Sequence, residues 1–174
     1  TLAIALMASL REESRLSDPL ADLDPASTQG RLEPVELDGS PDELDTFTRD
    51  LLTDMNTVWD RMFSDSGMPH REATRVVFRE FTDSGCGGAD EDMGPHYCTT
   101  DEVLYLDQAF FDLLFERQEE LESGALAEVW MLAHLVGHHV QEELGITEQV
   151  AELAEEESSR LAEALELQAD CLAG

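Results

Sequence analysis

The chain has 174 residues, of which 42% are hydrophobic, so it is long and apolar enough to form one globular domain. Forty Asp and Glu residues stand against ten basic residues, all of them arginine, and the formal net charge is -30. This charge repels phosphate backbones and anionic lipids, which disfavours nucleic-acid binding and direct membrane binding by the domain. Because the acids are spread along the chain, solvation in a salty environment explains them better than docking of cations or basic partners.

Residues 1–40 are predicted to form an N-terminal arm or linker that precedes a domain over residues 41–174. The opening run TLAIALMASL is shorter than the roughly 20 apolar residues of a membrane span. It is either the remnant of a trimmed signal or anchor, or a frayed amphipathic helix. Residues 11–40 are rich in Asp, Pro, Ser and Gly with little periodicity, which is typical of an irregular segment.

The domain is predicted to begin with a long helix. Ser40 can cap it, Pro41 suits its first position, Glu43 completes a capping box, and the helix should end near Ser66–Gly67. Its apolar residues recur at helical spacing, at Leu44, Phe47, Leu51, Met55, Val58, Trp59 and Met62. Residues 75–81 (RVVFREF) and 102–106 (EVLYL) are predicted strands, and the intervening residues 82–100 are predicted to form a glycine-rich loop.

Three further helices are predicted after the second strand. Asp107 can cap the first, which passes through Phe110, Phe111 and Leu114. The second covers residues 125–144 with Gly145 as its C-terminal stop, and the third begins at Thr147 and reaches the chain end. The fold class is therefore α+β and predominantly helical, with a small strand pair and a cysteine-containing loop.

Two pairs of polar residues in the last two helices are candidates for a metal site. His134 and His138 are four residues apart, so their imidazoles share one helical face and can bind one Zn²⁺. Glu166 and Asp170 have the same spacing, and a turn at Gly145 would bring them towards the histidines. Glu166 would then be a third ligand, and Asp170 would accept a hydrogen bond from a ligating imidazole. In a chain this acidic, both acids are equally consistent with a solvated helix face.

The three cysteines allow two interpretations. Cys86 and Cys98 lie twelve residues apart and can close a small disulfide loop, which would imply an oxidising compartment. Alternatively, these two and Cys171 are buried free thiols.

The order of motifs resembles that of the bacterial neutral zinc metallopeptidase family. The run AHLVGHHVQEELGI followed by ELQADCLAG is similar to the family's paired signatures, A-H-E-x-G-H-H-V-Q and E-L-Q-A-D-C. The upstream runs SGCGGAD and GPHYCTTDEVLYLDQAFF, and the run NTVW before them, resemble family segments in the same order. The resemblance covers roughly residues 50–174 and implies a zincin-like metallopeptidase core.

The resemblance assigns a role to each matching residue. It implies that His134, His138 and Glu166 are the zinc ligands, as in gluzincins, and that Asp170 is the aspartate that hydrogen-bonds a ligating histidine. It favours a disulfide between the loop cysteines Cys86 and Cys98 and, with the apolar N-terminus, an extracytoplasmic, secreted or membrane-anchored location. His139 also matches, but adjacent helical residues face about 100° apart, so it is not expected to bind the same ion.

The chain departs from the family pattern in three places. Leu135 stands where the resemblance places the catalytic glutamate, and leucine can neither accept nor donate a proton. Glu142 and Glu143 are too far along the helix to replace it. His96 stands where the family has an aromatic residue, and is interpreted as a surface loop histidine rather than a metal contact. The chain also ends earlier than family members usually do.

The function expected from the resemblance is peptide-bond hydrolysis by zinc-activated water, impaired here by Leu135. The alternative is a non-catalytic zinc-binding module, a pseudoprotease that binds a peptide or protein partner. A third hypothesis, a helical domain without metal, is disfavoured because all three ligand positions are retained. Whether the protein is an active enzyme, which peptide it binds and its oligomeric state do not follow from the sequence.

Overall fold

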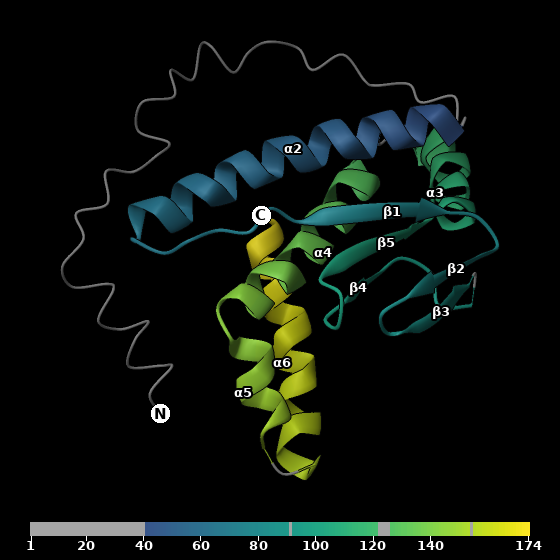
Figure 1. Ribbon diagram of the computed structural model, residues 1–174. Helices are drawn as coiled ribbons and strands as arrows, with labels where there is room; N and C mark the ends of the chain where they lie inside the picture. The colour runs from purple at the N-terminus through teal and green to yellow at the C-terminus, as the bar shows by residue number, and fades with distance from the viewer. Residues whose placement is uncertain (1–40, 91, 122–125, 154) are drawn as a thin grey trace. The chain divides into compact units, whose positions relative to one another are not determined.

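The computed structural model describes residues 41–90, 92–121, 126–153 and 155–174, all within one compact unit of the chain (Figure 1). The predicted arm over residues 1–40, with the cap at Ser40, lies outside the described residues. In chain order the elements are α2 (Pro41–Asp65), β1 (Thr74–Phe78), β2 (Phe81–Ser84), β3 (Gly87–Asp90), β4 (His96–Cys98), β5 (Val103–Asp107), α3 (Gln108–Leu121), α4 (Leu126–Glu143), α5 (Ile146–Ala151) and α6 (Glu155–Ala173). The fold is α+β and mainly helical, as predicted.

The strands form two small sheets rather than one strand pair. In the three-stranded sheet, β5 lies in the centre, parallel to β1 and antiparallel to β4, and β2 pairs with β3 in a separate hairpin. The prediction of a loop over residues 82–100 was therefore wrong in part, because it missed β2, β3 and β4. These strands have three or four residues each, too few to show an alternating apolar pattern. The predicted strand over 75–81 ends at Phe78, because the left-handed backbone at Glu80 (φ 67°) turns the chain into β2.

The buried face of α2 differs from the predicted stripe. Leu44, Leu52 and Phe63 are buried, whereas Val58 and Met62 are more than half exposed. Thr48 takes a buried position, because its hydroxyl donates to the carbonyl oxygen of Leu44 at 2.7 Å. A pattern based on hydrophobicity alone does not predict burial of a polar residue whose hydroxyl is hydrogen-bonded to a backbone carbonyl of its own helix.

The main core lies between the helices and one face of the three-stranded sheet. Leu104 and Leu106 of β5 pack with residues of α2 and α4, and Tyr105 between them faces a second cluster, with Phe78, Ala89 and Cys98. The two clusters occupy opposite faces because successive side chains of a strand alternate. The sheet thereby holds α4 on one side and the β2–β3 hairpin on the other.

The C-terminal helices confirm two predicted signals and correct a third. Asp107 caps α3 through a 2.9 Å bond from the Ala109 N–H to its carboxylate, and Gly145 ends α4 with φ 65°. The predicted final helix is two helices, α5 and α6, and α6 lies beside α4 (Figure 1). Within the described ranges, no helix has the length and hydropathy needed to cross a membrane.

Candidate metal centre

The two helices that carry the candidate ligands pack unusually closely. A Cβ atom built on Gly137 of α4 would lie 2.9 Å from the backbone oxygen and 3.0 Å from the Cα of Ala169 in α6. Because backbone atoms cannot move aside as a flexible side chain does, only glycine fits at this crossing. Gly137 lies between His134 and His138, and Ala169 lies between Glu166 and Asp170. The close approach therefore places the two polar pairs side by side.

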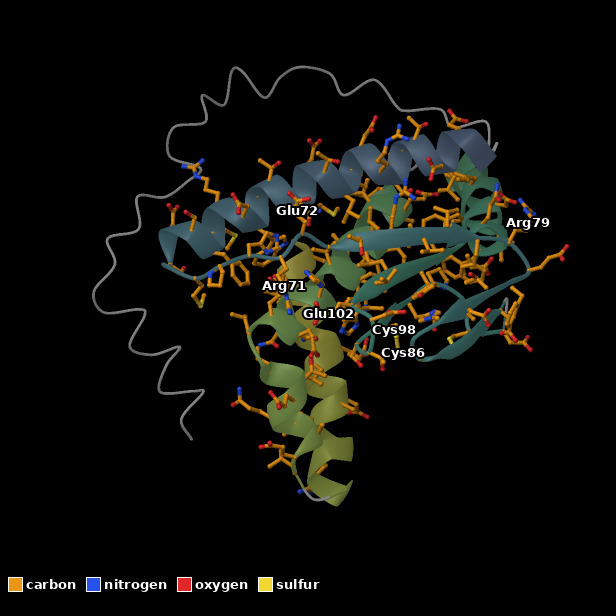
Figure 2. All side chains as sticks on the ribbon, in the orientation of Figure 1. Arg71, Glu72, Arg79, Cys86, Cys98 and Glu102 are labelled. Carbon is orange, nitrogen blue, oxygen red and sulfur yellow. A yellow bond between two sulfur atoms is a disulfide. The ribbon has the colours of Figure 1, made fainter. Side chains whose placement is uncertain are left out.

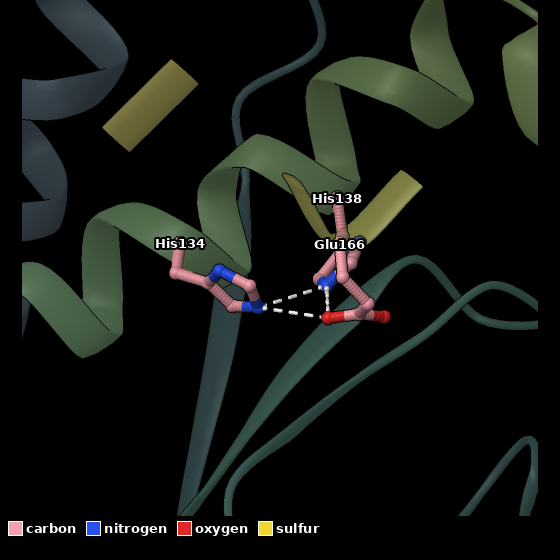
Figure 3. A group of neighbouring side chains, drawn as sticks. All are labelled: His134, His138 and Glu166. Carbon is pink, nitrogen blue, oxygen red and sulfur yellow. Dashed lines mark hydrogen bonds and ion pairs between the residues drawn. The ribbon is translucent and has the colours of Figure 1, made fainter. Parts of the chain in front are cut away.

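The structure brings His134, His138 and Glu166 into one cluster (Figure 3). The Nε2 atoms of the two imidazoles are 3.1 Å apart, and Glu166 Oε2 lies 3.3 Å from the first and 3.5 Å from the second. Both histidines are partly buried, and the Glu166 side chain is 62% exposed. Within the described part of the chain, no other group of three such side chains comes close enough together to hold a metal ion.

Hydrogen bonds on the far side of each imidazole determine which nitrogen carries the proton. His134 Nδ1 lies 2.8 Å from Asp170 Oδ1, and His138 Nδ1 lies 3.0 Å from Gln141 Oε1. Both oxygens can only accept, so each neutral imidazole donates from Nδ1 and keeps a lone pair on Nε2. In this tautomer the two lone pairs face each other and the carboxylate oxygen. A metal ion between the three atoms, or a proton on one of the Nε2 atoms, would relieve the repulsion between them.

The spacing of the three atoms suits zinc. For tetrahedral zinc with ligand bonds of about 2.0–2.1 Å, neighbouring ligand atoms lie about 3.3–3.4 Å apart. The three observed separations are 3.1, 3.3 and 3.5 Å. Two imidazole nitrogens with one carboxylate oxygen are also a donor set that zinc accepts, and a fourth position remains for water or substrate.

Gln141 belongs to the site, although it was not among the residues predicted from the sequence. It is 1% exposed, and its amide nitrogen donates to the Leu165 carbonyl oxygen at 2.7 Å and to Gln168 Oε1 at 3.1 Å. These bonds orient its Oε1 towards His138 and join α4 to α6. The available signal was its place three residues after His138, on the same helical face.

Leu135 lies in the wall of a cavity of about 570 Å³ that also contains the three candidate ligands. The leucine is 3% exposed and belongs to the main core cluster. Residues of α4, α6, α5 and the β4 region line the cavity: Pro95, His96, Tyr97, Thr99, Trp130, Met131, His134, Leu135, His138, Gln141, Thr147, Ala162, Leu165 and Glu166. Glu166 is the single acidic residue among them, although the chain carries forty acids.

The other histidines and the nearby glutamate of α4 lie away from the three-atom cluster. His139 points away from the ligand cluster on α4, and its ring nitrogens contact Tyr97 and the backbone of Arg71. Glu143 is nearly fully buried against His70 and takes no part in lining the cavity. His96 is not the surface loop histidine that was expected, because it begins β4, is half-buried and stacks on Tyr105 with ring centroids 5.2 Å apart.

Cys86 and Cys98 form a disulfide, whose yellow bond lies between the β2–β3 hairpin and β4 in Figure 2. The Cys98 residue is fully buried at the end of β4, and Cys86 lies on the exposed turn of the hairpin. The bridge therefore connects the hairpin to the strand that borders the cavity. Cys171 is a free, exposed cysteine, which corrects the alternative of three buried thiols.

Comparison with known protein families decides what kind of protein contains this site. A family model described as "Putative neutral zinc metallopeptidase" matches residues 12–174, nearly the whole chain. The chain belongs to this family. The family implies Zn²⁺ as the cofactor, in agreement with the chemistry of the donor set. No solved structure matches the chain.

Relatives of this metallopeptidase family member include proteins of Escherichia coli and Mycobacterium tuberculosis. "Uncharacterized protein YpfJ" of Escherichia coli K12 is 37% identical over 138 residues, which cover 76% of this chain and 47% of that protein. "Uncharacterized protein Rv2575" of Mycobacterium tuberculosis H37Rv is 36% identical over 123 residues, which cover 69% of this chain and 39% of that protein. The chain thus spans less than half the length of these two relatives.

Proposed function

We propose that the protein is a zinc metallopeptidase homologue in which His134, His138 and Glu166 hold one zinc ion and peptide hydrolysis is impaired by Leu135. The observation that carries the proposal is the convergence of two imidazole Nε2 atoms and one carboxylate oxygen, 3.1–3.5 Å apart. This spacing is close to that of ligand atoms around tetrahedral zinc. The zincin-like character of the core belongs to the same proposal.

Asp170 and Gln141 prepare the two imidazoles for this role. Each accepts the Nδ1 proton of one histidine, which fixes the ring orientation and leaves Nε2 as the ligand atom. Partners of this kind raise the basicity of the imidazole and typically change metal affinity by about 10–100-fold. A bound zinc ion would supply Lewis-acid catalysis, by polarising a substrate carbonyl and lowering the pKa of water. Because Leu135 replaces the family's glutamate, the site lacks the carboxylate that would take a proton from the activated water.

A peptide or protein is the proposed partner at this site. The edge strand β4 pairs only with β5 in the described structure, so its other edge has no strand partner there, and we propose that an extended chain pairs with it. The cavity beside it is lined by apolar side chains, among them Trp130, Met131 and Leu165. Backbone pairing along β4 with an apolar side chain in the cavity is the arrangement that these surfaces favour.

The second candidate function is a zinc-binding module that binds peptide without cleaving it. The observation that favours it is Leu135, which is 3% exposed and packed into the main core. Because Leu135 packs in the core, the fold accommodates an apolar residue at the position of the general base. The cavity beside it can then bind a peptide without cleaving it. Both candidates share the metal centre and differ only in hydrolysis.

We also propose that the protein works outside the cytoplasm. The disulfide between Cys86 and Cys98 supports this location, because disulfides persist in oxidising compartments and are rare where glutathione and thioredoxin keep thiols reduced.

Elemental analysis of the purified chain tests the metal centre. We expect about one zinc per chain in the wild type and almost none in His138→Ala, which removes one of the three ligand atoms. His96→Ala is the matched control, because it removes a histidine that lines the same cavity but lies outside the ligand cluster. A wild type that takes up no zinc even after incubation with excess metal would contradict the proposal, as would full zinc content in His138→Ala.

A further inference from the structure

Behind the candidate metal centre lies a second group of polar side chains that the proposed chemistry does not use. His70, His139 and Glu143 have side chains only 1–3% exposed, and the hydroxyl of Tyr97 reaches them from β4. Buried polar groups of this kind are costly unless they are hydrogen-bonded, so their arrangement calls for a reason.

The hydrogen bonds of the group run in a defined direction. His139 Nε2 lies 2.7 Å from the Arg71 carbonyl oxygen, which can only accept, so the proton of the neutral ring is on Nε2. Its Nδ1 is then an acceptor for the Tyr97 hydroxyl at 3.2 Å. Burial raises the pKa of Tyr97 above its usual range, with the Glu102 carboxylate adding to the effect, so the hydroxyl keeps the proton that it donates.

The same group also anchors α4 to the segment that precedes β1. Glu143 accepts the Arg71 backbone N–H at 2.6 Å and the His70 Nδ1 proton at 2.8 Å. The Arg71 side chain forms a 3.2 Å ion pair with Glu102, which adjoins β5, and the two residues lie near each other in Figure 2. Two members of this buried group, His139 and Glu143, therefore belong to α4 itself. The Tyr97 hydroxyl is the member that β4 contributes.

We propose that Tyr97, acting through His139, is a positioning residue that holds β4 against α4 and so maintains the peptide-binding cavity between them. β4 and α4 both contribute lining residues to that cavity, and the Tyr97–His139 bond links the two elements directly. The use of β4 by a peptide rests on the proposed function. The mechanical link between β4 and α4 does not depend on it.

The position of the metal ligands is maintained by other contacts. The histidine pair is aligned by Gly137 packing on Ala169 and by the His134–Asp170 bond, both between α4 and α6, and by the His138–Gln141 bond within α4. Gln141 is itself bonded to α6. Loss of the Tyr97 hydroxyl should therefore disturb the peptide side of the cavity and leave the metal centre intact. This separation distinguishes a positioning role from a general loss of structure.

Amide hydrogen exchange of the full chain tests the link itself. Tyr97→Phe removes the hydroxyl and leaves the ring, so we expect exchange in β4 to accelerate about tenfold, as for the loss of one hydrogen bond worth ~1.4 kcal/mol. Thr48→Val is the matched control, because it removes another buried hydroxyl bond, within α2. Unchanged β4 exchange in Tyr97→Phe, or equal acceleration in the control, would overturn the proposal.

The functional consequence is measured in the Leu135→Glu background. There Tyr97→Phe should raise KM for a peptide about tenfold, leave kcat within about threefold, and leave zinc affinity within about twofold. Adding Tyr97→Phe to His139→Gln should change KM little further, because glutamine can replace the Nε2 donor to the Arg71 carbonyl but has no acceptor at the position of Nδ1. Additive effects, or a fall in kcat or zinc affinity without a change in KM, would refute the positioning role. If Leu135→Glu is itself inert, the catalytic part of the proposed function fails, and the exchange measurement still decides the link.

Discussion

Replacing Leu135 by glutamate is the change that most directly tests the proposed chemistry. The residue lies one turn before His138 and lines the cavity that contains the three candidate ligands. A positioned general base commonly contributes about 10²–10⁴ in rate. At 1.36 kcal/mol per factor of ten, this range corresponds to a barrier lower by about 2.7–5.4 kcal/mol. We therefore expect Leu135→Glu to cleave peptides at least about a hundredfold faster than the wild type.

The same substitution should weaken the fold in the absence of metal. Leu135 is 3% exposed and packs in the main core, and full burial of a leucine side chain contributes about 1.5–3 kcal/mol. Glutamate loses most of this contribution and adds the cost of removing a carboxylate from water. We expect the free energy of unfolding of zinc-free Leu135→Glu to fall by at least about 2 kcal/mol. Chemical denaturation of the zinc-free proteins measures it.

Leu135→Gln is the matched control for both effects. Glutamine has the length of glutamate and loses the same apolar contacts, but its amide does not act as a base at neutral pH. Casein or a fluorogenic peptide with zinc-loaded protein, with and without a chelator, provides the assay. Chelator-sensitive hydrolysis by the wild type at the rate of Leu135→Glu would refute the reasoning, as would an equal gain in Leu135→Gln. Inactivity of all three proteins would favour the peptide-binding module.

Three further predictions concern the parts that support the site. Glu166→Gln should lower zinc affinity at least about tenfold, measured by competition with a chromogenic chelator. Glu163 is an exposed acid one turn earlier on α6, so Glu163→Gln should leave the affinity unchanged. Gly137→Ala should lower the free energy of unfolding by about 1–3 kcal/mol in denaturant titrations, because the new methyl group meets backbone atoms of α6. Alanine is the better helix former, so a more stable variant would contradict the close packing. The pair Cys86→Ala with Cys98→Ala should lower the free energy of unfolding by about 2–4 kcal/mol, and an unchanged midpoint of thermal unfolding would show that the bridge does not stabilise the domain.

The sequence alone predicted the parts of the structure that depend on local chemistry. The long first helix, the cap at Asp107 and the stop at Gly145 follow from capping and turn preferences within a few residues, and all three are present. The i, i+4 spacing of His134 and His138 likewise places two imidazoles on one face wherever a helix forms. Family membership also followed from the order of motifs along the chain.

Only the tertiary structure decided how these parts meet. The short strands β2, β3 and β4 exist because they pair, and three or four residues leave no periodic signal in a sequence. The role of Gln141 depends on contacts with α6, 24 and 27 residues away, and the roles of Tyr97 and His139 depend on contacts 42 and 68 residues apart. Spacing identifies side chains that share a face of one element. The distance between faces of different elements is set by packing, which here depends on one glycine against one alanine.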